Sequence, residues 1–133
     1  MAAAGGKHSA AVDENGCLFV WGSGYYGQLG MGDTDERLDP TRVAGLPAPV
    51  RQVAAGYSHT GIVTEAGDLL MCGWGEDGRL GLGDEEDRAT PTLVARAVFD
   101  GEAVLMVACG AFHTAVLTAV SYTHLTLPTI CSV

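Results

Sequence analysis

The chain has 133 residues, of which 47% are hydrophobic, 17% are charged and 19 are glycines, a composition that suits a turn-rich β protein and not a helical one. Its formal net charge of −9 at pH 7 excludes the positive field that draws proteins to nucleic acid or to an anionic membrane. We therefore expect no direct nucleic-acid partner and no membrane partner.

The four cysteines, Cys17, Cys72, Cys109 and Cys131, form no C-x-x-C pair and have no regular spacing. The N-terminal residues show no charged segment leading into an apolar one, so no secretory signal is indicated. We expect free thiols in a reducing compartment, which places the protein inside the cell, in the cytoplasm or the nucleus.

The chain repeats itself. Residues 22–33 recur as residues 73–84, at an offset of 51, and His8 recurs as His59. A third copy opens at an offset of 54, where His113 answers His59. Such a period is typical of an array whose units must stack on one another to bury their apolar faces. Residues 2–5 align with residues 53–56, so we expect the chain to begin within a repeat.

In chain order, short apolar strands at residues 9–12 and 17–21 flank a turn in which Asn15-Gly16 supplies the positive-φ positions of a tight hairpin. The second unit repeats this hairpin at residues 60–63 and 69–72. Two hairpins at equivalent positions define the unit.

A glycine-rich stretch and an acidic loop follow each hairpin, and then a Pro-Thr pair and a short strand at residues 42–43 or 93–94. A further strand at residues 50–54 or 103–107 leads into the next unit. Four short strands per unit, joined by glycine turns, predict the blade of an all-β propeller. Leucines of the glycine-rich stretches are expected to fill the space between blades, at Leu29, Leu80 and Leu82.

The segments Gly56-Tyr57-Ser58-His59-Thr60 and Gly73-Trp74-Gly75-Glu76-Asp77-Gly78-Arg79-Leu80-Gly81 resemble the regulator of chromosome condensation repeat. The resemblance covers residues 1–118 and implies a propeller of about seven blades. The fold class is therefore a β-propeller fragment of about two blades plus the start of a third. The kelch repeat, the nearest competitor, carries a Gly-Gly doublet in each unit, whereas Gly5-Gly6 is not repeated here.

Residues 119–133 do not continue the repeat. Residues 120–129 resemble the translation of a transposase-end sequencing adapter, and Val133 would precede a stop codon of that adapter. We expect residues 119–133 to be a non-native read-through tail that carries no information on the fold.

Residues 22–27 and 73–78 both match the dinucleotide fingerprint G-x-G-x-x-G, and a nucleotide-binding enzyme is therefore the alternative function. Such a site needs a helix directly after the glycines. The glycines at positions 30, 32, 81 and 83 disfavour that helix. The motif is interpreted as structural, and we expect no cofactor.

Three histidines at equivalent positions, His8, His59 and His113, raise the alternative of a metal site. Because each occupies its own repeat, we expect each to hydrogen-bond within its own blade and to hold no metal. The acidic loops lack the alternating oxygen ligands of a calcium site, so they are interpreted as solvated, with recognition of a basic partner as the alternative. The uncharged residues 103–120 could suggest a membrane helix, but they match two strands of the preceding repeat.

The resemblance implies a scaffold for protein interaction and several possible tasks. These are guanine-nucleotide exchange on a small GTPase, docking on chromatin, regulation of a ubiquitin ligase, and ultraviolet-B sensing. The last is disfavoured because Trp21 and Trp74 lie in the glycine stretches and not beside the histidines. No catalytic residue set is found, so we expect no enzyme. The loop tips are the predicted partner-binding residues, namely Tyr25, Tyr26, Glu76 and Asp77.

Overall fold

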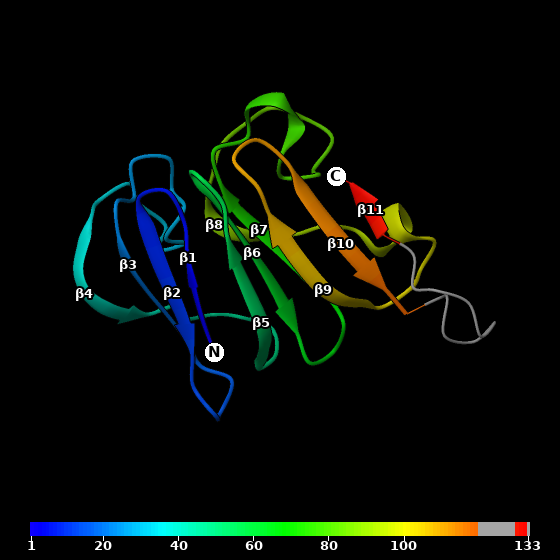
Figure 1. Ribbon diagram of the computed structural model, residues 1–133, viewed down its shortest axis with the longest axis horizontal. Helices are drawn as coiled ribbons and strands as arrows, with labels where there is room; N and C mark the ends of the chain where they lie inside the picture. Colours follow the sequence, from blue (N-terminus) through cyan, green and yellow to red (C-terminus); the bar gives the residue numbers. More distant parts are fainter. Residues whose placement is uncertain (120–129, 133) are drawn as a thin grey trace.

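The computed structural model describes residues 1–119 and 130–132 and places the chain in three antiparallel sheets that lie side by side (Figure 1). Blade 1 has the strand order β1-β2-β3-β4, blade 2 the order β5-β6-β7-β8, and blade 3 the order β11-β10-β9. The predicted propeller fragment of two blades and the start of a third is confirmed.

The inner strands follow the predicted hairpins. In blade 1 they are β1 (Ala2–Ala4), β2 (His8–Val12) and β3 (Leu18–Gly22), and in blade 2 they are β5 (Val50–Ala55), β6 (His59–Thr64) and β7 (Leu69–Gly73). Blade 3 contains β9 (Val104–Cys109), β10 (Thr114–Thr118) and β11 (Ile130–Ser132). Two single 3-10 turns, η1 (Glu76–Gly78) and η2 (Arg96–Phe99), complete the described part.

The outer strand of each blade differs from the expectation. It runs over Arg37–Arg42 (β4) or Arg88–Leu93 (β8), and not over residues 42–43 or 93–94. Pro40 and Pro91 therefore lie inside the strands and not before them. A proline lacks the N–H that a central strand must donate, but an outer strand has one edge without a partner strand and tolerates it.

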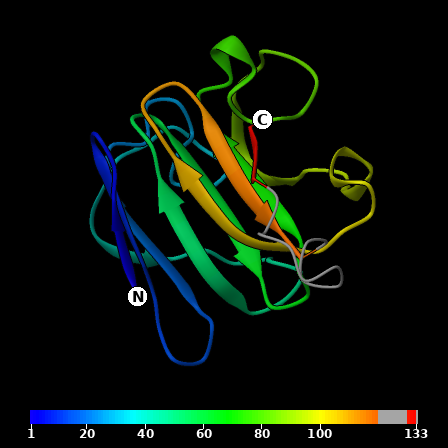
Figure 2. The ribbon, with the colours of Figure 1, turned by 45° about the vertical axis from the view of Figure 1, so that its right-hand side comes forward.

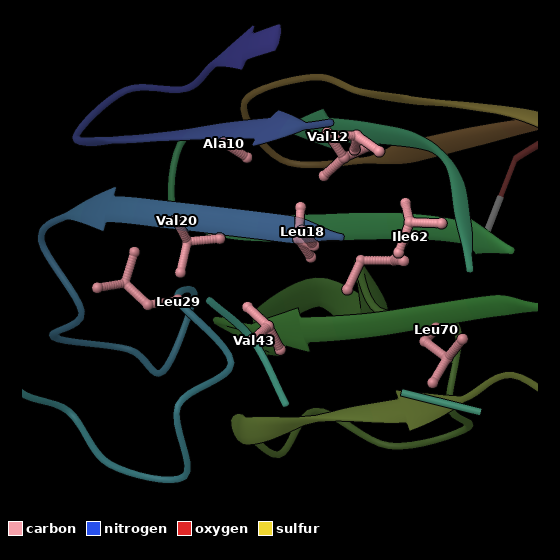
Figure 3. Packing of buried hydrophobic residues seen from close by; sticks show 10 residues of the cluster. Ala10, Val12, Leu18, Val20, Leu29, Val43, Ile62 and Leu70 are labelled. Carbon is pink, nitrogen blue, oxygen red and sulfur yellow. The ribbon is translucent and has the colours of Figure 1, made fainter. Parts of the chain in front are cut away.

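The hydrophobic cores lie between the blades. The first core joins blade 1 to blade 2, and Figure 3 shows Ala10, Val20 and Leu29 of blade 1 in the same layer as Ile62 and Leu70 of blade 2. The second joins blade 2 to blade 3 through Met71, Leu80, Val107 and Val116. Leu29 and Leu80 are each 1% exposed, and Leu82 packs against the second core while partly buried. A blade therefore buries its apolar face only by stacking on its neighbour, as repeat proteins do.

Residues 103–119 form strands β9 and β10 and not a helix. In the described part of the chain, no helix is long and apolar enough to cross a membrane. The predicted tail, residues 119–133, lies for the most part outside the described residues. Ile130–Ser132 are described, and they pair antiparallel with β10 in the register Val116 to Cys131.

Candidate protein-interaction surface

Five connections between strands gather at one end of the three blades, which we call the loop end. They are the turns at residues 5–7, 56–58 and 110–113 and the long loops at residues 23–36 and 74–87. Figures 1 and 2 both show the long loop after β7 and the β9–β10 turn at this end. The antiparallel order of every blade places these connections together.

The structure places all four predicted partner-binding residues at the loop end. Tyr25 is 72% exposed, whereas Tyr26 is half-buried. Glu76 and Asp77 are exposed in the 3-10 turn η1, where Asp77 adopts a positive φ of 62°. This conformation is uncommon for a residue with a side chain but is tolerated by aspartate. The backbone N–H of Asp77 donates to Oε1 of Glu85 over 3.0 Å, which fixes the turn.

Aromatic rings and one guanidinium connect these loops across the blades. Tyr25 meets Tyr26 edge to face with ring centroids 4.9 Å apart, and Tyr26 stacks on Trp74 at 4.6 Å with an interplanar angle of 14°. The guanidinium carbon of Arg79 lies 4.2 Å from the ring centroid of Trp74 and 5.2 Å from that of Phe112. We call this series, from Tyr25 in blade 1 to Phe112 in blade 3, the aromatic ladder.

Sequence reasoning missed the role of Trp74, Arg79 and Phe112. The available signal was the difference between repeats, because Arg79 replaces Gln28 at the equivalent position of the glycine-rich stretch. A charged residue at a position that the repeat buries must be paired with polar groups, since burial of an unpaired charge is costly.

Arg79 is only 1% exposed, and its charge is compensated locally. Its Nε donates to the Glu76 carbonyl oxygen over 2.7 Å, and its Nη1 donates to the Ala111 carbonyl oxygen of blade 3 over 3.3 Å. The Asp77 carboxylate is 3.7 Å away but 70% exposed, so water weakens that ion pair. Arg79 therefore ties blade 2 to blade 3 at the loop end mainly through carbonyl oxygens and rings.

The expectation that each histidine bonds within its own blade is wrong for two of the three. Nε2 of His8 lies 2.8 Å from the Thr60 hydroxyl oxygen of blade 2, and Nε2 of His59 lies 3.2 Å from the His113 carbonyl oxygen of blade 3. The repeat gives the three histidines equivalent positions, but it does not say that the side chain points across the gap between blades.

Burial lowers the pKa of His8 and His59, the two histidines that bridge neighbouring blades. Burial, and then the neighbouring charge of His59, lower the pKa of His8 to about 4. Burial likewise lowers the pKa of His59 to about 4, against an opposing contribution from its bond to the His113 carbonyl. Nδ1 of each ring is buried without a hydrogen-bond partner in the part of the chain that the structure describes. Both rings are therefore neutral at pH 7, with the proton on Nε2.

The acidic loops are closed by ion pairs between residues four apart. Arg37 Nη2 lies 2.9 Å from Asp33 Oδ2, and Arg88 Nη2 lies 2.8 Å from Asp84 Oδ2. The hydrogen bond from its arginine, followed by one from a backbone N–H, lowers the pKa of each aspartate below its usual value. The arginine–aspartate pair is the same in both loops. Asp35 and Glu36 are exposed in the first loop, whereas Glu85 and Asp87 of the second accept the backbone N–H groups of Asp77 and Gly75.

The glycine-rich stretches bring the backbones of neighbouring blades close together. Gly27 has a φ of +81°, and a Cβ atom there would lie 2.5 Å from the Cα atom of Ala89 in blade 2. The glycine thus permits a close approach of two backbones and not the approach of a ligand. The second stretch contains only the three-residue turn η1, and turns and bends follow it, not the helix of a dinucleotide site.

Within residues 1–119 and 130–132, no three histidine, cysteine or acidic side chains gather closely enough to hold a metal ion. Cys72 and Cys109 are free thiols whose pKa burial raises to about 12, so neither is ionised at pH 7. Cys17 is also a free thiol.

Comparison with known proteins gives one consistent result. The family model described as the regulator of chromosome condensation (RCC1) repeat matches residues 15–63 and 66–117. The ultraviolet-B receptor UVR8 of Arabidopsis thaliana is 45% identical over 113 residues, which is 84% of this chain and 25% of the receptor. The probable E3 ubiquitin-protein ligase HERC4 of Mus musculus is 38% identical over 120 residues, which is 87% of this chain and 11% of the ligase.

Among solved structures, Prp20p of Saccharomyces cerevisiae, described with its binding properties to Gsp1p and histones, superposes with a TM-score of 0.78 and 26% identity. The match covers 86% of this chain and 29% of the yeast chain. The chain thus spans a quarter or less of the two curated relatives named above. Family model, relatives and fold agree, and the chain belongs to the RCC1 repeat family.

Proposed function

We propose that the chain is a protein-interaction module that binds its partner at the loop end, through Tyr25, Tyr26, Glu76 and Asp77, and that it acts by binding and not by catalysis. One observation carries this proposal. The aromatic ladder ends in strongly exposed rings, with Tyr25 72% and Phe112 60% exposed. Exposed aromatic side chains on a fixed support are the usual anchors of protein interfaces.

The charge of the loop end favours a basic partner. Glu76 and Asp77 are exposed beside the ladder, and the acidic loops at residues 33–36 and 84–87 lie on the same end of the blades. The chain as a whole carries a net charge of −9. Such a field speeds the approach of a positively charged protein and repels nucleic acid.

The finer role that we propose is regulatory, either nucleotide exchange on a small GTPase or control of a ubiquitin ligase. The relatives named above include a photoreceptor, a ligase and a protein studied for binding Gsp1p and histones. Because these proteins differ in task but share the repeat, the common element is a surface for contact with another molecule.

The test uses the full chain with two purified candidates, a small GTPase and core histones. Calorimetry measures binding by the unmodified chain and by a variant carrying Tyr25→Ser, Glu76→Gln and Asp77→Asn. Leu93→Ser is the matched control, because Leu93 is 53% exposed and pairs with Leu70 at the end of the outer strand β8 that lies away from the loop end. We expect the triple variant to lose at least tenfold in affinity and the control to lose nothing.

Equal loss in both variants, or binding of neither candidate, would contradict the proposal. The rate at which a fluorescent guanine nucleotide leaves the GTPase then separates the two finer roles. An accelerated release assigns exchange, and binding without acceleration favours the ligase-type regulatory role.

A further inference from the structure

A hollow opens at the loop end where blade 1 meets blade 2. Its volume is about 470 Å³, and we call it the Gln28 hollow after one of the residues that line it. Where blade 2 meets blade 3, Arg79 takes the position equivalent to Gln28 and lies 4.2 Å from the ring centroid of Trp74. Gln28 is shorter, and Ser23 stands at the position equivalent to Trp74. The first repeat therefore leaves open a space that the second repeat fills with its own side chains.

Hydrogen-bond donors surround this hollow. It is lined by one lysine, one glutamine, one tryptophan, two serines and three tyrosines. Each of these side chains carries an N–H or O–H group. Among the described residues, no acidic one lines the hollow. The lining therefore favours a ligand that accepts hydrogen bonds.

Two of the lining side chains are almost fully buried and still have unused donors. Gln28 is 1% exposed, and its Oε1 accepts from the Tyr26 backbone N–H over 2.9 Å, which leaves its amide nitrogen free to donate elsewhere. Ser58 is 2% exposed. In the part of the chain that the structure describes, neither the Gln28 amide nitrogen nor the Ser58 hydroxyl donates to a protein group. Buried polar side chains normally have partners, so these two indicate a place for a bound acceptor.

Lys7 supplies a positive charge at the same place. It is the only lysine of the chain, is exposed and lines the hollow. The arginines of the loop end, Arg37, Arg79 and Arg88, each lie between 2.8 and 3.7 Å from a carboxylate oxygen. No ion pair of Lys7 is found among the described residues. Lys7 is therefore the loop-end cation that is left to pair with a carboxylate from another molecule.

We propose that the Gln28 hollow receives an acidic side chain of the partner protein. Its carboxylate accepts from the Gln28 amide and the Ser58 hydroxyl and pairs with the Lys7 ammonium. An ionised carboxylate is acceptor-only and has about four lone-pair sites, so it can use donors from several side chains at once. This inference rests on the proposed function, because it names the group that the partner inserts at the loop end.

The acidic surroundings of the hollow define the rest of the partner segment. Glu76 and Asp77 are exposed at the same end of the blades, and the chain carries a net charge of −9. This field repels a wholly acidic segment. A phosphate group, with about two negative charges, fits less well than a carboxylate, since Lys7 is the one cation among the described residues that line the hollow. The segment that fits carries one carboxylate between basic residues.

The experiment titrates the full chain with three acetylated and amidated pentapeptides of the form Lys-Gly-X-Gly-Lys, in which X is glutamate, glutamine or arginine. The overall field of the chain alone would favour the arginine peptide, which is the most positive, and would disfavour the glutamate peptide. The hollow predicts the opposite order. We expect the glutamate peptide to bind about tenfold more tightly than the other two, because a charged acceptor strengthens the hydrogen bonds.

Nuclear magnetic resonance locates the bound peptide. The chain has two glutamines, and the side-chain amide of Gln52 is already bonded to the backbone of Val107 in both directions, over 2.7 Å each. We expect the glutamate peptide to shift the side-chain NH₂ signals of Gln28 and to leave those of Gln52 in place. Binding that does not move the Gln28 signals would overturn the inference.

Two variants matched in charge test the role of Lys7. Lys7→Gln and Arg42→Gln each remove one positive charge, but Arg42 is exposed and pairs with Phe19 at the end of β4 that lies away from the loop end. We expect Lys7→Gln to weaken binding of the glutamate peptide by about two- to fivefold, the range of an exposed charge pair. Arg42→Gln should leave it unchanged. Equal affinities of the two variants would contradict the inference.

A third variant, Gln28→Met, removes the buried amide and keeps a side chain of similar length. It should weaken binding of the glutamate peptide by about tenfold and bring it to the level of the glutamine peptide. Full affinity in a folded Gln28→Met chain, or an arginine peptide that binds the unmodified chain more tightly than the glutamate peptide, would overturn the inference. If this variant fails to fold, the Lys7 comparison and the Gln28 signals decide.

The outcomes also separate this inference from the proposed function. If the glutamate peptide does not bind, but the triple variant of Tyr25, Glu76 and Asp77 still loses its protein partner, the loop end is the interface and the hollow is not its carboxylate site. If the peptide binds and the triple variant keeps full affinity for the protein, the proposed interface fails and the hollow remains.

Discussion

Two junctions hold the blades together: blade 1 meets blade 2 at the first junction, and blade 2 meets blade 3 at the second junction. They share one hydrogen bond and differ in the side chains at the loop end. In both, a threonine hydroxyl on the second strand of the next blade donates over 2.7 Å to a carbonyl oxygen, from Thr60 to Gln28 and from Thr114 to Arg79. At the loop end, however, Gln28 borders a hollow, whereas Arg79 lies between two rings. The shared bonds make blades stack, and the variable side chains give each junction its own surface.

A lower pH should protonate His8 and His59, the buried rings that bridge the two junctions. We expect this protonation to give the largest loss in the free energy of unfolding. The folded state lowers the pKa of His8 and His59 from 6.5 to about 4, so the unfolded chain binds more protons between these values. The contribution of the two neutral rings to the free energy of unfolding is therefore fully present above pH 6.5, and it is lost as the pH falls toward 4. The loss is at most roughly 3 kcal/mol for each histidine.

Urea unfolding at pH 7, 6, 5 and 4.5 measures this loss. The variant His113→Asn is the matched control, because the His113 side chain is exposed and bridges no further blade among the described residues. Its curve should run parallel to that of the unmodified chain. A stability that does not change between pH 7 and 4.5 would contradict the bridging role of the two buried rings.

Substitution of Gly56 should break the second junction at its backbone contact. A Cβ atom at Gly56 would lie 2.6 Å from the Gly110 carbonyl oxygen and would also overlap the His59 ring. We expect Gly56→Ala to lower the free energy of unfolding by about 3 kcal/mol, the upper part of the overpacking range. Gly45→Ala is the comparison, since nothing lies within 4 Å of a Cβ there and only its φ of +78° opposes the change. That control should lose about 1–2 kcal/mol.

Arg79 and Gln28 are the side chains that distinguish the two junctions, and their removal should lower the free energy of unfolding by different amounts. Arg79→Ala removes a buried guanidinium with two hydrogen bonds and a ring contact, and it should cost about 2–3 kcal/mol. Gln28→Ala removes one bond to the Tyr26 N–H and should cost about 1 kcal/mol. Urea midpoints at an unchanged m-value measure both losses. Equal losses would show that the two junctions do not differ in the way described.

Added nucleotide should leave the melting temperature unchanged, which is the smallest of the expected effects. Both glycine-rich stretches turn back on their own blades, and neither leads into a helix. The melting temperature should therefore be the same with and without ATP, GTP or NAD at millimolar concentration. A site whose dissociation constant lay about 1,000-fold below that concentration would stabilise the fold by about 4 kcal/mol. A rise with one nucleotide would restore the nucleotide-binding alternative.

The repeat made most of the fold predictable from the sequence. Asn15-Gly16 and its counterpart at Gly67 located the hairpins, and the offset of 51 gave the blades. The outer strands were misplaced because a proline is usually taken as the end of a strand, whereas β4 and β8 contain one. The direction of the histidine side chains was also wrong. A repeat shows which residues are equivalent, but not to which neighbour they point.

The candidate site was predictable only in part. Tyr25 and Tyr26 were selected as loop residues, and the structure stacks Tyr26 on Trp74 of the next blade. That contact joins residues 48 positions apart and depends on how the blades are set against each other. The hollow beside Gln28 was not predictable in advance, because it exists only where a smaller side chain takes the place that Arg79 fills in the next repeat.

Pro40 and Pro91, inside the outermost strands β4 and β8, also bear on how this protein behaves at high concentration. The outer edge of a sheet is a template on which a strand of another molecule can add, and cross-β fibres grow in this way. A proline removes one N–H from that template, and the arginines at positions 37, 42 and 88 place charge along it. Addition of a foreign strand to the rim is disfavoured, so the molecule can display apolar faces for stacking without offering its outer edge to fibre growth.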